Sequence, residues 1–102
     1  MAATRIPNEG AILSQAELAR RVVEETGGTP RWWSNGAGDR YDWHEHPYHK
    51  VLFCSKGSIV FHLHDGDVEL GPGDRLDVEP GTSHSATVGR EGVTCVEAAR
   101  EA

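Results

Sequence analysis

Residues 58–70 read SIVFHLHDGDVEL, and this stretch decides the fold class. In its first half Ile59, Phe61 and Leu63 alternate with other residues, so they would share one face of a strand. Asp65-Gly66 then predicts a two-residue hairpin turn, because a type I′ turn needs a positive φ at both central residues. The stretch therefore predicts two antiparallel strands with one buried face.

The chain after Pro30 continues in the same way, with short β-favouring runs separated by Gly, Pro and Asp. The expected strands, this hairpin included, lie at 31–33, 40–46, 51–54, 58–64, 67–70, 75–78, 85–88 and 93–97. About eight short strands with tight turns between them indicate an antiparallel sandwich or barrel. The fold class is therefore expected to be mainly β.

One helix is expected before the strands, at about 15–26. Ser14 and Glu17 have the spacing of a capping box, in which each side chain accepts a hydrogen bond from the other residue's backbone N–H. An apolar stripe follows, and Gly27-Gly28 with Pro30 ends it. We interpret this helix as a packing or dimer element.

Composition limits the function classes. The chain of 102 residues, 37% of them hydrophobic, has room for one domain, expected at 14–102 with an N-terminal arm at 1–13. A formal charge of −6 argues against nucleic-acid binding. No apolar run is long enough to span a membrane and no secretory leader is apparent, so we expect a cytoplasmic protein with reduced cysteines. A homodimer is expected, because so short a chain buries a limited core.

Six histidines are the unusual feature of this composition, and five of them lie between His44 and His64. His44-Glu45-His46 places two imidazoles on the same face of a strand, because strand side chains alternate with a period of two. Two neutral imidazoles can chelate one divalent ion, and a third ligand must then come from elsewhere in the fold. His84 is the best candidate, because it follows a turn at 80–83 that can project it inward.

The chain resembles the cupins, the RmlC-like superfamily, at two motifs. The first motif matches at Gly38, His44, His46 and Gly57. The second matches at Gly73, Gly81 and His84, whereas Glu79 replaces its proline and Val88 its asparagine. The resemblance implies a small double-stranded β-helix, that is a jelly-roll barrel, with a metal held inside it. The helix expected at about 15–26 would precede this barrel.

Lys50 stands where the cupin motif has a glutamate ligand. A protonated ammonium cannot ligate a metal ion and repels it. Three alternatives follow: His44, His46 and His84 alone hold the metal, His49 joins them as a fourth ligand, or the site is metal-free and Lys50 binds an anionic ligand. The expected cofactor is one divalent transition metal, namely Zn, Fe, Ni, Cu or Mn.

Strand parity predicts further residues around this site. Arg40 and Asp42 would share a face with His44, Arg40 to hold a substrate carboxylate and Asp42 to orient a liganding imidazole. Leu52 and Cys54 share parity with Lys50 and are expected to line a cavity. Trp43 is expected to form part of the cavity wall because it is bulky and apolar.

A second His-x-His pair, His62 and His64, lies on the strand that opened this section. Ile59, Phe61 and Leu63 form the apolar face of that strand, so the two histidines are expected to point out of the barrel or into a dimer contact. A secondary surface metal site is the alternative, because the pair could chelate an ion.

The sequence predicts a small metal-binding cupin and leaves two functions open. The first is a metalloenzyme acting on a small organic acid or ketone, as a dioxygenase, an isomerase or a lyase, with Lys50 and Arg40 supplying charge and proton transfer. The second is a non-catalytic module that binds a small molecule, a carbohydrate among the candidates, or a metal. The barrel alone cannot decide between them, because one fold carries many chemistries.

Overall fold

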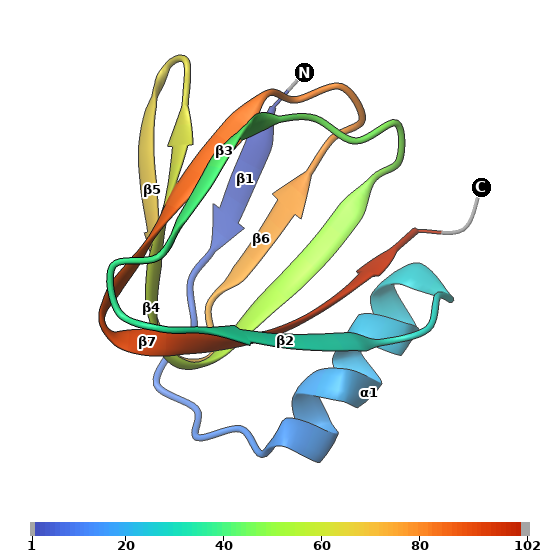
Figure 1. The fold of residues 1–102 in the computed structure, drawn as a ribbon. Coiled ribbons are helices and arrows are strands. Elements are labelled where there is room, and N and C mark those ends of the chain that lie inside the picture. Colours follow the sequence, from blue (N-terminus) through green and yellow to red (C-terminus); the bar gives the residue numbers. More distant parts are fainter. Residues whose placement is uncertain (1, 101–102) are drawn as a thin grey trace.

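Two long bent strands, β4 (Lys50–Leu63) and β7 (His84–Ala99), form the centre of the computed structural model, which describes residues 2–100 (Figure 1). They pair antiparallel from Lys50 opposite Ala99 to His62 opposite Ser85. The sequence predicted each as two shorter strands, and this was wrong. Both strands bend near Gly57, which lies opposite Val93, and Gly92, with φ of 73° and 78° at the two glycines. A Cβ at Gly57 would collide with the Gly92 carbonyl. Glycine thus lets the strands turn a corner without ending.

The other strands complete a seven-stranded antiparallel sheet that curls into a barrel (Figure 1). They are β1 (Ala3–Ile6), β2 (Arg31–Asn35), β3 (Arg40–His44), β5 (Gly66–Leu70) and β6 (Arg75–Val78). Their order is β1-β6-β4-β7-β2, with β3 also on β7 and β5 also on β4. The predicted hairpin is confirmed as β4–β5, closing with Leu63 opposite Gly66. The fold is mainly β, as expected.

Part of the predicted N-terminal arm is a strand. β1 pairs antiparallel with β6, from Ala3 opposite Val78 to Ile6 opposite Arg75. The segment after β1 is held by Asp74, whose carboxylate accepts a hydrogen bond from the Asn8 N–H at 2.7 Å. Three of the four β1 residues are exposed, so the sequence lacks the alternation by which a buried strand is recognised.

The helix α1 (Gln15–Thr26) has the predicted bounds and the predicted capping box at Ser14 and Glu17. It lies outside the barrel beside β7 (Figure 1) and buries Leu18 and Val22 completely. The side chains packed against it come from one face of β4 and β7, namely Val51, Phe53, Val96 and Ala98. Within residues 2–100 no helix has the length and apolarity needed to cross a membrane.

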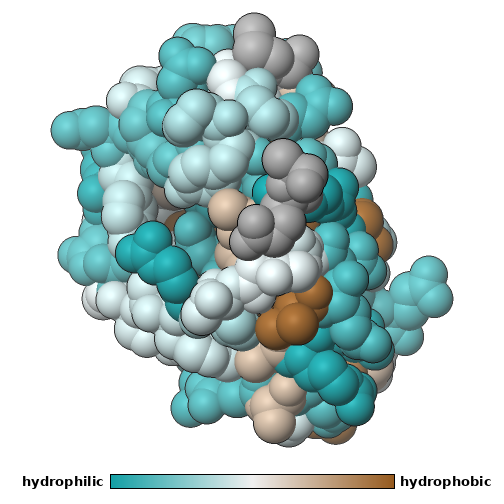
Figure 2. Space-filling model, turned by 90° about the vertical axis from the view of Figure 1, so that its right-hand side faces the viewer, coloured by the Kyte–Doolittle hydropathy of each residue, from teal (hydrophilic) through white to brown (hydrophobic). Residues whose placement is uncertain are grey.

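The opposite face of the same strands fills the barrel. The interior cluster includes Leu52, Cys54, Ile59, Phe61 and Cys95. Cys54 lies opposite Cys95 across the β4–β7 pair, and both are free and fully buried. Outside, the face drawn in Figure 2 is mostly hydrophilic, with apolar atoms in small separate areas. At one end of the barrel this apolar packing stops, and His44, His46 and His84 lie there.

Candidate metal centre

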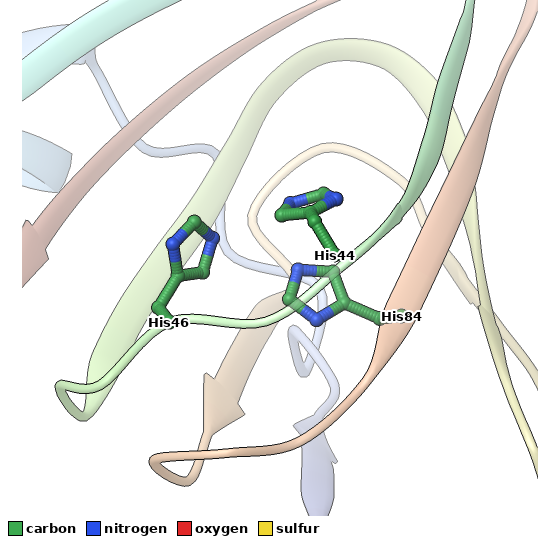
Figure 3. Close-up of side chains that lie close together, drawn as sticks. All are labelled: His44, His46 and His84. Carbon is green, nitrogen blue, oxygen red and sulfur yellow. The ribbon is translucent and has the colours of Figure 1, made fainter.

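Three histidines from separate positions in the chain meet at this mouth. His44 ends β3, His46 follows it in the connection to β4, and His84 begins β7 directly opposite His44. Figure 3 shows the three rings converging on one space. Their centroids are 4.3 to 5.4 Å apart, and one nitrogen of each ring lies within 4.8 Å of the other two. Nitrogen ligands of a tetrahedral metal lie about 3.4 Å apart, so small side-chain movements would close the group around an ion.

Backbone carbonyls orient two of these rings. His44 Nδ1 donates to the Asp42 carbonyl at 2.7 Å, and His84 Nδ1 donates to the Thr82 carbonyl at 2.8 Å. An imidazole that donates from Nδ1 presents the lone pair of Nε2, which is the arrangement of a metal-ligating histidine. The contact at His44 comes from the Asp42 main chain, whereas strand parity had predicted the Asp42 side chain for this role, and that side chain lies along a separate surface depression.

Two of the inward nitrogens lack any partner. His46 Nε2 and His84 Nε2 are buried and make no hydrogen bond. A buried polar atom without a partner costs free energy that a bound metal ion would offset. The donor set therefore fits a divalent transition metal.

The surroundings of His84 and His46 favour the neutral imidazole, which is the form that metal ligation requires. Burial is the main cause that lowers the pKa of His84 to about 4, and the charges of Lys50, His44 and His46 act in the same direction against the Thr82 hydrogen bond. Burial likewise lowers the pKa of His46, with Lys50 and His44 adding to the effect and Glu97 opposing it.

A cavity of about 290 Å³ opens beside the three histidines. Its aromatic walls are Trp32, Trp33, Tyr41, Tyr48 and Phe61. Its charged groups are Arg31, Lys50 and Glu97. The arrangement can place a small organic molecule next to the three imidazoles.

Lys50 is the one residue predicted as catalytic that lines this cavity. Its Nζ lies 3.6 Å from Glu97 Oε1, and Glu97 Oε1 also accepts a hydrogen bond from Trp33 Nε1 at 2.7 Å. Sequence reasoning missed Glu97. The available signal was parity on β7, because Val93 and Cys95 on the same face belong to the barrel interior.

His49, the expected fourth ligand, is not brought to the centre. Its Nε2 is buried without a partner, but among the described residues it belongs neither to the three-histidine group nor to the cavity wall. Lys50, the first residue of β4, points into the cavity. Because neighbouring side chains in a strand alternate, His49 points away from it.

The predicted common face of Arg40 and His44 is not formed. The β3–β7 register shifts between Tyr41 and His44, so Tyr41 shares the cavity with His44 while Arg40 lies along a separate surface depression. Trp43 lines the same depression and is 50% exposed. The irregularity reverses side-chain parity along β3, which a regular strand would have kept.

Leu52 and Cys54 do face the barrel interior, but below the cavity. Both are fully buried in the apolar cluster and neither lines the cavity. The cavity floor is formed by their neighbours Ile59 and Phe61. These two predicted cavity residues are therefore core residues.

Known proteins share a family and a fold with this chain. A family model described as the AraC-like ligand binding domain matches residues 34–95. No curated protein sequence matches the chain.

Solved structures share the fold at low sequence identity. A protein of unknown function from Rhizobium leguminosarum is 15% identical, with a TM-score of 0.68 over 74% of this chain and 71% of that one. An RmlC-like cupin from Shewanella frigidimarina is 19% identical, with a TM-score of 0.64 over 72% of this chain and 66% of the other. The DMSP lyase DddQ from Ruegeria pomeroyi is 23% identical, with a TM-score of 0.65 over 71% of this chain but 37% of the lyase.

Proposed function

The chain belongs to the AraC-like ligand-binding domain family as a small cupin domain, and from this premise we propose that it holds one divalent transition metal on His44, His46 and His84. The cavity beside the metal binds a small organic acid or ketone. The observation that carries the proposal is the pair of buried, unpartnered nitrogens, His46 Nε2 and His84 Nε2. Imidazole ligands suit Zn, Fe, Ni and Cu, and Mn is the remaining candidate.

Three protein ligands leave coordination positions open for substrate. When bound, the metal supplies Lewis-acid polarisation of a substrate oxygen or activation of dioxygen. The carbonyls of Asp42 and Thr82 keep two rings oriented, and aromatic side chains form much of the wall beside them. Lys50 supplies a positive charge at the cavity wall.

The reaction would be of the dioxygenase, isomerase or lyase type. The likeness to a DMSP lyase makes lyase chemistry one candidate, although this chain spans just over a third of that protein. The second candidate function is a non-catalytic module that binds a small molecule, and the description of the matching family as ligand-binding favours it. Oxygen uptake and product formation with a panel of small acids and ketones separate the two.

Metal analysis of protein produced without a histidine tag tests the metal directly. We expect about one equivalent of a transition metal, and a lower thermal midpoint after chelation, because a metal that binds the folded state stabilises it. Less than about a tenth of an equivalent would overturn the metal proposal.

A cytoplasmic homodimer remains part of the proposal. Trp43 is half exposed and Trp32 is 40% exposed, and burial against a second copy would remove apolar surface from water. Elution as a monomer at micromolar concentration would contradict it.

A further inference from the structure

Lys50 has hydrogen-bonding capacity that the protein does not use. Its side chain is 7% exposed, yet its ammonium group makes no hydrogen bond within residues 2–100 and has one ion-pair partner, Glu97, at 3.6 Å. That carboxylate oxygen is already held at a shorter distance by Trp33 Nε1, at 2.7 Å. An ammonium carries three donors, so Lys50 can still donate to a ligand in the cavity that it lines.

The charges around the cavity favour an anion. Arg31 at the cavity wall has no ion-pair partner within the described residues, and Lys50 is balanced by Glu97 alone. The three histidines are neutral ligands and would add no negative charge. An anionic group beside Lys50 would accept charge-assisted hydrogen bonds, which are about twice as strong as neutral ones.

The walls favour a flat apolar body. Trp33 and Tyr41 meet edge to face with ring centroids 5.8 Å apart, and Tyr48 stacks on His46 at 5.0 Å. Phe61 adds a further ring. The volume of about 290 Å³ lies at the small end of the range for ligand sites. The cavity therefore suits one planar ring or a short unsaturated chain.

We propose that the cavity takes a small planar carboxylate whose carboxylate group binds Lys50 and whose apolar body lies among Trp33, Tyr41 and Tyr48. Glu97, held by Trp33, is a positioning residue that keeps the Lys50 ammonium in place. The inference deepens the proposed function by naming the ligand class of the same cavity, and it depends on the lysine rather than on the metal.

Isothermal titration calorimetry with benzoate and its neutral isostere benzamide tests this, on metal-free and on zinc-loaded protein. We expect benzoate to bind at least about tenfold more tightly than benzamide, because the carboxylate forms charge-assisted hydrogen bonds with the Lys50 ammonium and the neutral amide does not. The Lys50→Met variant should lose that preference. Lys56→Met removes the chain's other lysine, which is exposed on β4, and should bind benzoate as the parent does.

Lys50→Met removes the ion-pair partner of the Glu97 carboxylate and could impair folding, so the double variant Lys50→Met/Glu97→Gln serves as the second test. It removes both charges together and should also bind benzoate no better than benzamide. The inference is overturned if either folded variant keeps the parent preference, or if the parent shows no saturable benzoate binding up to about 10 mM.

The two proposals fail separately. Protein that binds benzoate through Lys50 but purifies without metal would overturn the metal centre alone. Protein that holds a full equivalent of metal but does not distinguish benzoate from benzamide would overturn the carboxylate inference alone.

Discussion

The chain contains two His-x-His pairs that end in opposite environments. The inner pair, His44 and His46, faces the cavity and meets His84 from another strand. The outer pair consists of His62 on β4 and His64 in the turn that follows it, and neither lines that cavity. Both pairs have the same spacing in the sequence, so the spacing alone does not determine what the rings do.

The outer rings are already partnered by the protein. His62 Nδ1 lies 2.9 Å from Asp67 Oδ1, and His62 Nε2 lies 2.9 Å from Thr87 Oγ1. His64 stacks on Trp43 with ring centroids 4.6 Å apart and planes 3° from parallel. With both nitrogens of His62 engaged, the outer pair acts as part of the sheet surface.

The difference shows what a metal centre needs beyond two histidines on one strand face. Inside, each ring keeps a nitrogen free and a third ring approaches from β7. Outside, Asp67 and Thr87 engage both nitrogens of His62, and His64 stacks on Trp43. Within residues 2–100, His44, His46 and His84 are the single group of His, Cys, Asp or Glu residues with ligand spacing.

Removing each pair in turn should give the largest contrast. We expect His44→Ala/His46→Ala to weaken zinc binding by more than about 100-fold, because replacing even groups that only support metal ligands costs 10–100-fold. His62→Ala/His64→Ala should leave zinc affinity unchanged. Competition with a fluorescent chelator measures both. Equal losses in the two double variants would show that the inner pair is not the metal centre.

The inner centre and the helix were predicted from local signals. A capping box and Gly27 delimit α1, and motif spacing with chain order singled out His44, His46 and His84. What escaped prediction depends on neighbours far away in the chain. The Trp33–Glu97 hydrogen bond spans 64 positions, and no local pattern encodes it.

Strand irregularities explain the other differences. The register shift between Tyr41 and His44 breaks the parity along β3, so Arg40 lies along the outer depression and not on the face of His44. A glycine bend in β4 looked in sequence like the end of one strand and the start of another. A pattern with a period of two cannot locate the residue at which a bulge reverses it.

The burial of His84 should make the stability of metal-free protein depend on pH. Its pKa is about 4 in the folded protein, mainly because of burial, with Lys50, His44 and His46 facing it, against an ordinary value of 6.5. Between these two values the unfolded chain binds the proton and the folded protein does not. The free energy of unfolding should therefore fall as the pH is lowered from about 6.5 to about 4, by at most about 1.4 kcal/mol per pH unit for this group.

Urea denaturation of chelator-treated protein at a series of pH values measures this fall. The His84→Gln variant should have a shallower slope over the same window, because glutamine does not titrate. Identical slopes for the parent and the variant would contradict the effect assigned to His84.

The smallest effect is expected from the outer pair, in the His62→Ala variant. The substitution removes the contacts with Asp67 and Thr87, but the His62 side chain is 31% exposed, so water can take over both partners. The free energy of unfolding should fall by about 1 kcal/mol, with an unchanged m value in urea and unchanged metal content. Thr87→Val, which removes one of the two partners, should cost less than that. A loss of metal in His62→Ala would mean that the outer surface supports the inner centre. The two pairs would then differ only in how strongly each affects metal binding.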